Sequence, residues 1–368
     1  MVKNKDELMM DLEVLRGEPI ETIAPDKIPC EEINDSAFLC KAPLVSVCMI
    51  THNHELYIRK AIEGVVSQQA DFLFELIIGE DCSTDRTREI CLEYQKMYPA
   101  IIRVLISDYN VGASGNLMRV SGACRGKYIA WCEGDDGWIA PDKLARQIAA
   151  FAKYPSLVVV STGAQLVAHN GHLIEKDAKK CYSDDCLILG ADIYNALCVS
   201  FRLHFFSCSV MFDRIASDRA KKKHSLFFAK LFLGDTTLWL ALALEGDYYH
   251  LVQPMVFYRK SLGSVTRNTA TAWKVDRDGW LVRYYFARKV SSDKAVLECI
   301  LANYRQCLAE HYILDGHGVR EHWRGLLLAL KEKCFLKICI KFFVLRINEG
   351  RRLAKKALGW VHCECAAG

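Results

Sequence analysis

The chain of 368 residues has the composition of a globular protein, with 51% hydrophobic and 25% charged residues, and this excludes a disordered or fibrous class. Its length is sufficient for one large α/β domain with a smaller appendage. The formal net charge of +4 is too small to indicate nucleic-acid binding, and no basic stripe interleaved with aromatic residues is present.

The 17 cysteines include no CxxC pair, and many stand inside apolar runs, where a reduced cysteine packs as a small hydrophobe. No apolar core follows the positively charged start, so no secretory signal is predicted. No uncharged apolar run reaches the ~18 residues that a membrane-spanning helix needs. We therefore expect a reduced, cytoplasmic protein.

The sequence predicts three regions. Residues 1–43 form an N-terminal accessory segment with a short acidic helix at 6–15. Residues 44–268 form the main domain, with its catalytic part between about 44 and 258. Residues 269–368 are helical by periodicity and basic, with a break at 316–318.

Short apolar runs alternate with amphipathic segments through the first half of the main domain. The apolar runs predict strands buried on both faces, at 44–50, 74–80, 101–107, 127–133 and 157–162. The segments between them predict helices at 58–66, from 84, at 112–124 and from Pro141. Further strands are expected at 207–212 and 248–258, on either side of a helix at 235–245. Strands alternating with helices indicate a mostly parallel sheet with helices on both faces.

Polar clusters follow three of these strands, at 51–53, 80–81 and 134–136. Ligands of such sheets bind outside the carboxyl ends of the strands, at the point where the strand order reverses. We therefore expect the three clusters to meet in one crevice.

Asp135 and Asp136 are adjacent carboxylates at a strand end, and they could hold Mg²⁺ or Mn²⁺ against a substrate diphosphate. The alternative is a solvated turn, in which Asp and Gly are common. Trp138 and Pro141 follow directly and favour a turn fixed against the core.

Asp81 could accept a hydrogen bond from the edge of a nucleobase, while Ser83 or Thr84 caps the next helix. Asp235 precedes an apolar helix, where a carboxylate serves either as an N-cap or as a general base for an acceptor hydroxyl. Asn110 to Asn116 form a glycine-containing turn that leads into a helix, which is weak evidence for a phosphate loop.

Taken together, these segments resemble glycosyltransferase family 2, inverting enzymes of the GT-A (Rossmann-like) fold. The resemblance covers roughly residues 43–260, in the stretches that contain THNHELYIRKAIEG, FELIIGEDCSTDRT, NVGASGN, GKYIAWCEGDDGW and GDTTLWLALALEGD. The variants GEDCSTD and EGDD look like those of bacterial enzymes that build surface polysaccharides or glycolipids.

The resemblance implies a role for each candidate residue. Asp235 takes the place of the catalytic base, Asp136 that of the ligand to Mn²⁺ or Mg²⁺, and Asp135 that of a contact on the ribose side. The residues implied to bind the nucleotide sugar are Thr51, His52, Asn53, Glu55, Asp81, Asn116 and Asp135. The histidine that follows the Tyr-Arg pair in many relatives is replaced here, because Lys260 and Ser261 follow Arg259.

The expected reaction is the metal-dependent transfer of one sugar from a nucleoside-diphosphate sugar, by resemblance a UDP-sugar, to a hydroxyl of a saccharide or lipid-linked saccharide. The QxxRW motif of processive synthases is absent, which favours one sugar per encounter. Two alternatives stay open. A nucleotidyltransferase would act on a sugar phosphate, although the loop after the first strand lacks the expected glycine. A degenerate, non-catalytic binding subunit is the other alternative, against which the retained carboxylates count.

The C-terminal region is strongly basic, with eleven basic and four acidic residues between 319 and 368. Aromatic and aliphatic residues stand between the charges of 331–358, a pattern that predicts peripheral contact with the inner face of the cell membrane. The alternative is that these apolar residues pack on the catalytic domain.

Overall fold

The computed structural model describes residues 28–178, 182–198, 205–225, 228, 234–260, 269–290 and 294–314. The chain divides into two compact units, Met1–Asn268 and Thr269–Gly368. The expected acidic helix at 6–15, the break at 316–318 and the basic stretch 331–358 lie outside the described residues.

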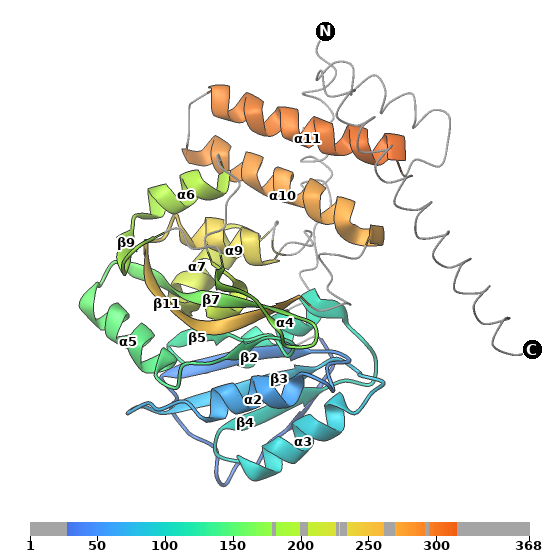
Figure 1. The fold of residues 1–368 in the computed structure, drawn as a ribbon, viewed down its shortest axis with the longest axis vertical. Helices are drawn as coiled ribbons and strands as arrows, with labels where there is room; N and C mark the ends of the chain where they lie inside the picture. Colours follow the sequence, from blue (N-terminus) through green and yellow to red (C-terminus); the bar gives the residue numbers. More distant parts are fainter. Residues whose placement is uncertain are drawn as a thin grey trace, which may run out of the picture. The chain divides into compact units, whose positions relative to one another are not determined.

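A mixed β-sheet forms the centre of the first unit (Figure 1). Its strands are β1 (Glu31–Ile33), β2 (Val45–Thr51), β3 (Phe74–Glu80), β4 (Ile102–Ile106), β5 (Tyr128–Trp131), β6 (Gly137–Trp138), β7 (Leu157–Ala168), β8 (Leu173–Ala178), β9 (Cys186–Ile188), β10 (Met211–Asp213) and β11 (Asp247–Lys260). Their order is β1-β4-β3-β2-β5-β10-β7-β11-β6, with β8 beside β7 and β9 beside β11.

Strands β4, β3, β2 and β5 run parallel to one another, and β7 runs parallel to β11. β10 lies between β5 and β7 and is antiparallel to both. The strand order reverses at β2, because the chain adds β3 and β4 on one side and returns to add β5 on the other. Ligands of such sheets bind at the point where the strand order reverses.

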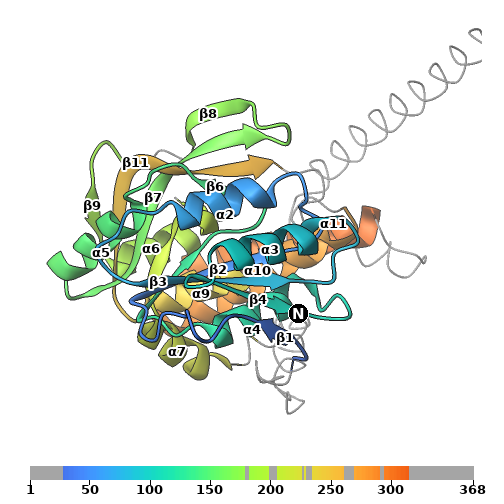
Figure 2. The ribbon, with the colours of Figure 1, turned by 90° about the horizontal axis from the view of Figure 1, so that it is seen from below.

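Helices cover both faces of the parallel strands. α2 and α3 lie on one face and α4 lies on the opposite face (Figure 2). Within its described residues, the α-helices of this unit are α2 (Ile58–Val66), α3 (Thr87–Met97), α4 (Gly112–Ala123), α5 (Lys143–Lys153), α6 (Gly190–Cys198), α7 (Arg214–Lys223) and α9 (Gly234–Leu242). Apolar side chains at helical spacing are buried on α2, where Ile58, Ala61, Ile62 and Val65 have no exposed surface.

The predicted fold class is confirmed, and the five alternating strands form where their apolar runs predict them. Several boundaries differ, and β7 for example continues to Ala168 instead of ending at 162. Residues 207–209 form a 3-10 turn before β10 instead of a strand. The helix expected from residue 84 begins at Thr87, because the Asp85 carboxylate accepts the Thr87 N–H (2.9 Å) and holds 84–86 as a turn.

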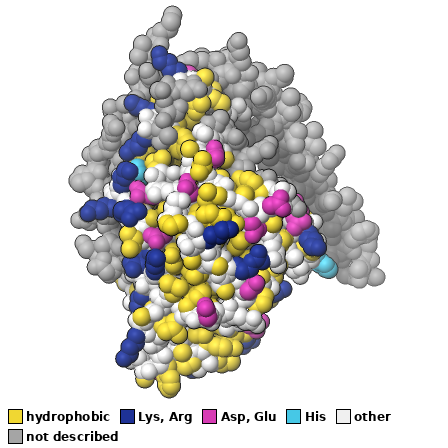
Figure 3. Space-filling view, turned by 90° about the vertical axis from the view of Figure 1, so that its left-hand side faces the viewer, with side chains coloured by type: hydrophobic (Ala, Val, Ile, Leu, Met, Phe, Trp, Pro, Cys, Tyr) yellow, Lys and Arg dark blue, Asp and Glu magenta, His cyan; other side chains and the backbone are white. Residues whose placement is uncertain are grey.

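In the second unit, α10 (Thr269–Val290) and α11 (Lys294–Leu314) contact each other. Within the described residues, no helix has the length and apolar character needed to cross a membrane. On the face of the protein shown in Figure 3, described acidic and basic side chains are interspersed among apolar ones.

Gly64 of α2 allows a first prediction. A Cβ atom there would meet the Trp138 carbonyl oxygen at 2.7 Å and the Trp138 nitrogen at 3.0 Å. Inside a helix, replacing glycine by alanine normally raises the free energy of unfolding by up to ~1 kcal/mol. We expect Gly64→Ala instead to destabilise the protein by ~1–3 kcal/mol, because main-chain atoms of β6 cannot move aside as a flexible side chain can.

Chemical denaturation measures this change. The control is Gly122→Ala at an exposed position of α4, expected to stabilise the protein by up to ~1 kcal/mol. A Gly64→Ala protein as stable as the wild type would show that α2 is free to shift away from β6.

Candidate active site

The loops that follow β2 and β3 leave the sheet side by side. In the parallel register of the two strands, Thr51 stands opposite Glu80. The Asp81 N–H continues the ladder by donating to the Thr51 carbonyl (3.1 Å). Two of the three predicted polar clusters are therefore brought together by main-chain pairing.

Side chains then bind each loop to the other. Asn53, whose φ is +54°, accepts the Thr84 N–H on Oδ1 (2.8 Å). Glu55 accepts the Arg86 N–H (3.0 Å), and its own N–H donates to Asp85 Oδ2 (3.0 Å). Asn53 and Glu55 were both predicted to bind the nucleotide sugar. Here the amide oxygen of Asn53 and the carboxylate of Glu55 hold the two loops together.

His52, in the loop after β2, contacts residues of the loops after β3 and β4. Its Nδ1 is 2.9 Å from the Asp81 carbonyl oxygen and 3.2 Å from Asn110 Nδ2. Thr51 is buried, with Oγ1 3.2 Å from His54 Nδ1. His52 is the more exposed of the two predicted ligands, and within the described residues the hydrogen bonds of its ring involve Nδ1.

Asp81 is only 2% exposed. Its Oδ1 accepts the Val111 N–H (2.9 Å) and lies 3.6 Å from Arg119 Nη2. Arg119 is as deeply buried, and Nη2 also donates to the Glu80 carbonyl (2.8 Å). The sequence analysis missed Arg119, although its place three residues after Asn116 on α4 puts the two on one helical face.

Asn116 lies inside the protein. Its Nδ2 donates to the Gly79 carbonyl (2.8 Å), and its Oδ1 accepts from Arg119 Nε (2.9 Å). A Cβ atom on Gly79 would come within 2.1 Å of that oxygen. Both amide atoms are therefore engaged in holding α4 against β3, which is a supporting position and not one facing a phosphate.

An acidic turn, residues 133–136, connects β5 to β6. The Asp136 N–H donates to the Glu133 carbonyl (3.0 Å), and the Gly134 N–H donates to the Ile50 carbonyl (3.0 Å). A Cβ atom on Gly134 would lie 2.6 Å from Thr51 Oγ1. Glycine is required here because the turn packs directly on the loop after β2, and the third predicted cluster thereby joins the other two.

The carboxylates of the acidic turn differ in exposure. Asp135 is half-buried, whereas Asp136 is 2% exposed and its Oδ1 accepts the Arg259 N–H (2.8 Å). Burial raises the pKa of Asp136 well above its usual value, and the charges of Asp135 and Glu133 raise it further. Asp136 is therefore a buried residue, whereas a residue of a solvated turn would be exposed.

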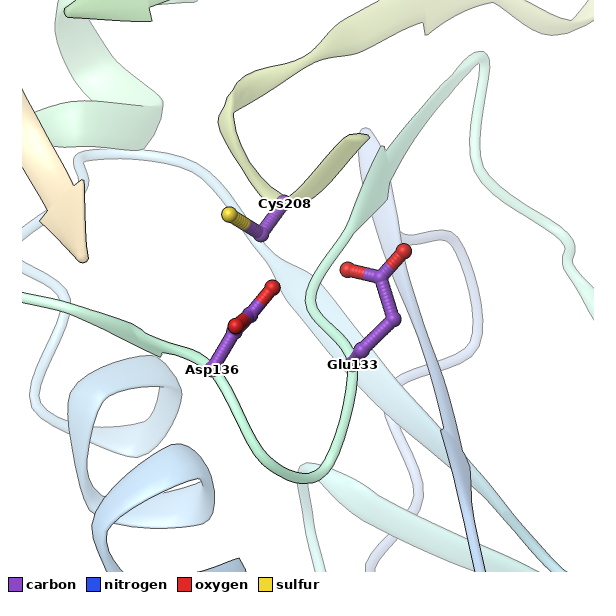
Figure 4. Close-up of side chains that lie close together, drawn as sticks. All are labelled: Glu133, Asp136 and Cys208. Atoms are coloured by element: carbon purple, nitrogen blue, oxygen red, sulfur yellow. The ribbon is translucent and has the colours of Figure 1, made fainter. Parts of the chain in front are cut away.

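Glu133 was not among the predicted ligands, although it belongs to the same EGDD segment. Burial raises its pKa to about 7, and the charges of Asp135 and Asp235 add to this. Its Oε2 has no hydrogen-bond partner among the described residues. Ligand atoms of Glu133, Asp136 and Cys208 lie within 4.8 Å of one another and face the same small space (Figure 4). Burial raises the pKa of the Cys208 thiol, which therefore stays protonated beside the two carboxyl groups.

Asp235 occupies the first turn of α9 and is half-buried. Its Oδ1 accepts the Thr236 N–H (2.6 Å). The helix already begins at Gly234, so Asp235 is inside the first turn and not at the preceding N-cap position. The charge of Asp235 adds to the rise in the pKa of Glu133, which is caused mainly by burial.

Comparison with known proteins identifies the domain. Residues 46–173 match the model of "Glycosyl transferase family 2". These residues therefore belong to glycosyltransferase family 2. The resemblance seen in the sequence is confirmed, and the matched segment includes β2 to β7, the loops after β2 and β3, and the acidic turn.

Curated relatives of this family 2 domain come from several bacteria. An uncharacterized protein of Mycobacterium tuberculosis (strain H37Rv) is 37% identical over 127 residues, which are 34% of this chain and 37% of the relative. The Bacillus subtilis protein named "Putative teichuronic acid biosynthesis glycosyltransferase TuaG" is 28% identical over 242 residues, which are 65% of this chain and 87% of the relative. The chain thus spans about a third of the length of the mycobacterial relative and most of the second.

Solved structures share the fold. S. aureus TarS 1-349 in complex with UDP-GlcNAc superposes with a TM-score of 0.54 at 17% identity, covering 78% of this chain and 80% of TarS 1-349. At that identity the likeness shows a common GT-A architecture alone.

The position of Asn116 leads to a second prediction. Asn116→Ala removes the partner of Arg119 Nε and of the Gly79 carbonyl, and leaving such buried groups unpaired costs about 1–3 kcal/mol. We expect a lower midpoint of unfolding, with the nucleotide affinity of the folded protein nearly unchanged. Calorimetry on the same samples measures both. A large loss of nucleotide affinity at unchanged stability would restore Asn116 as a direct ligand.

Proposed function

We propose that this protein transfers a single sugar from a nucleoside-diphosphate sugar to an acceptor hydroxyl, with inversion at the anomeric carbon. The observation that supports the proposal is the packing of the acidic turn against the loops after β2 and β3, one of which carries Asp81, at one edge of a family 2 domain. Binding of the base, of the diphosphate and of the acceptor would then occur along that edge.

Asp81 is proposed to select the nucleobase. Its Oδ1 is held by the Val111 N–H and faces Arg119 Nη2, so the carboxylate has a fixed orientation. No hydrogen bond of its second oxygen is found in the described part of the chain, which leaves that oxygen for an imide N–H such as that of uracil. His52 and Thr51 form the adjoining wall.

The acidic turn fits a divalent cation. Three carboxyl groups lie there, and the charge of Asp135 raises the pKa of both Glu133 and Asp136. The Glu133 Oε2 atom has no partner within the described residues, and oxygen ligands suit Mg²⁺ and Mn²⁺. We propose Asp136, through its second oxygen, and Glu133 as the protein ligands, with Asp135 on the ribose side. A cation bound there would neutralise charge on the leaving diphosphate.

Asp235 is proposed as the general base. It would take the proton of the acceptor hydroxyl as that oxygen forms a bond to the anomeric carbon. The bond from this carbon to the diphosphate oxygen breaks on the opposite side, and the diphosphate leaves with the electron pair. The transition state has oxocarbenium character, and no covalent bond to the protein forms.

The nucleotide-sugar ligands of TarS 1-349 and the name of the Bacillus relative support a UDP-sugar donor and an acceptor in surface polysaccharide assembly. A lipid-linked acceptor would make membrane contact through 331–358 useful. A screen of nucleotide sugars for donor hydrolysis with and without Mn²⁺ tests the proposed activity. Release of pyrophosphate from a nucleoside triphosphate and a sugar phosphate would instead support a nucleotidyltransferase.

A third prediction concerns the cation. Asp136→Asn keeps an oxygen that accepts the Arg259 N–H but removes the charge, so we expect a folded protein with Mn²⁺ affinity lowered by ~10²-fold or more. EDTA should abolish donor hydrolysis by the wild type. Titration calorimetry and thermal unfolding measure affinity and folding separately.

Asp135→Asn is the matched control, since it removes the same charge one residue away. We expect it to weaken donor binding while keeping Mn²⁺ binding close to that of the wild type. The opposite pattern would move the metal ligand from Asp136 to Asp135, and full activity in EDTA would overturn the metal proposal.

A fourth prediction separates binding from chemistry. Asp81→Ala should weaken nucleotide binding, because the base loses its acceptor. Asp235→Asn should leave donor binding near normal and lower kcat by ~10²-fold or more, as expected for the loss of a general base. Donor titration and single-turnover kinetics measure the two effects. If Asp235→Asn changed only stability, by the ~1 kcal/mol typical of a capping residue, the residue would be structural.

A further inference from the structure

Arg259, near the end of β11, connects separate segments around the acidic turn. Its Nε donates to the Asp135 carbonyl (2.8 Å), and its Nη1 donates to the carbonyls of His169 (3.1 Å) and Ala168 (3.3 Å). Its main-chain N–H donates to Asp136 Oδ1 (2.8 Å). One residue therefore binds the acidic turn in two places and joins it to the hairpin formed by β7 and β8.

Aromatic rings enclose the same guanidinium group. Its central carbon lies 4.6 Å from the centre of the Tyr57 ring and 5.2 Å from that of Phe257. Tyr57 belongs to the loop after β2, at the start of α2. Arg259 is 6% exposed, so the loop after β2 becomes a third segment held by this side chain.

The charge of Arg259 is not paired with a carboxylate, because no ion pair of this residue occurs among the described residues within 4.0 Å. Main-chain carbonyls and ring faces surround it instead. An arginine used only to hold the fold commonly has a carboxylate partner, as Arg103 and Arg125 have in Glu75. Here the cation is directed at the main chain of the turn that carries Asp135 and Asp136.

The pairing of β6 with β11 ends before the acidic turn. β6 pairs with β11 only at Trp138 with Val256 and at Gly137 with Phe257. The two hydrogen bonds of Arg259 to Asp135 and Asp136 begin where this pairing ends. They fix the last two residues of the turn, whose side chains the proposed reaction uses.

We propose that Arg259 is a positioning residue that sets the geometry of the acidic turn for the cation and the donor. The inference rests on the proposed function for what the turn binds. It goes beyond that function by assigning this geometry to a residue outside the turn. Lysine cannot replace arginine here, because a planar group with fixed N–H directions is needed to reach the Asp135 and His169 carbonyls together.

Hydrogen exchange of the intact protein tests the structural part without any substrate. In Arg259→Lys we expect exchange in residues 133–138 to accelerate by about tenfold or more, with β3 unchanged, because local opening needs no global unfolding. The matched control is Lys260→Gln, which alters an exposed cation on the next residue of the same strand and should leave the turn as in the wild type. The proposal would be overturned if hydrogen exchange in residues 133–138 of Arg259→Lys were as slow as in the wild type. It would also be overturned if exchange were accelerated evenly over the whole sheet.

Mn²⁺ titration tests the functional part. Removing a residue that orients metal ligands typically lowers metal affinity by ~10–100-fold, and we expect this in Arg259→Lys but not in Lys260→Gln. Nucleotide affinity measured in EDTA should fall much less than Mn²⁺ affinity, since Asp81, the proposed ligand of the base, is held by Val111 and Arg119 and not by Arg259. Unchanged Mn²⁺ affinity in a variant with a loosened turn would overturn the positioning role.

A second pair of variants tests the proposal even if Arg259→Lys does not fold. Tyr57→Leu removes the ring that covers the guanidinium, and we expect a smaller acceleration of exchange in 133–138 together with weaker Mn²⁺ binding. Tyr57→Phe keeps the ring and should match the wild type. Equal behaviour of the two variants would show that the ring does not act through Arg259. If the wild type bound no Mn²⁺ at all, the proposed function would fail while the exchange result still stood.

Discussion

The site depends on the parallel register of β2 with β3 and β5. Because Thr51 stands opposite Glu80, Asp81 can donate its N–H to the Thr51 carbonyl, and the loops after the two strands leave the sheet together. The acidic turn then packs on Thr51 through Gly134. A shift of one residue in this register would turn each of these side chains to the other face of the sheet.

Two carboxyl groups at opposite ends of the parallel strands have different surroundings. Glu75, near the start of β3, is fully buried. Burial raises its pKa, but hydrogen bonds from Arg125 and Ser46 outweigh burial and the pKa is lowered. At the opposite end the pKa of Glu133 is raised to about 7 and its Oε2 is unpaired among the described residues. Glu75 is thus neutralised by arginines within the fold, whereas Glu133 is buried beside other carboxyl groups, which favours its protonated form.

Several polar residues near the site support others instead of facing a ligand. Asn116 holds Arg119 and β3, Asn53 and Glu55 hold the next loop, and Arg259 holds the acidic turn. Such supporting hydrogen bonds fix the few groups that are left unpaired. Together they fix the orientation of these loops in the absence of a substrate.

The sequence by itself determined the alternation of strands and helices, the class of fold and the three polar clusters. Short apolar runs and helical periodicity are local properties, and parallel strands bring their carboxyl ends to one edge. The match to glycosyltransferase family 2 agrees with the motifs that the sequence shows. The short strands β1, β8 and β9 and the antiparallel position of β10 were not predictable, because three to six residues carry too little pattern.

Only the tertiary structure decided which candidate side chains are free and which are used. Asn116 and Asp81 were both candidate ligands, yet the amide of Asn116 is engaged on both atoms while Asp81 keeps an oxygen without a partner in the described part of the chain. The roles of Glu133, Arg119 and Arg259 depend on burial and on contacts with segments distant in sequence. Spacing along the chain does not encode these contacts, since hydrogen-bond partners more than a hundred residues apart, such as Arg259 and Asp136, meet only when the sheet has formed.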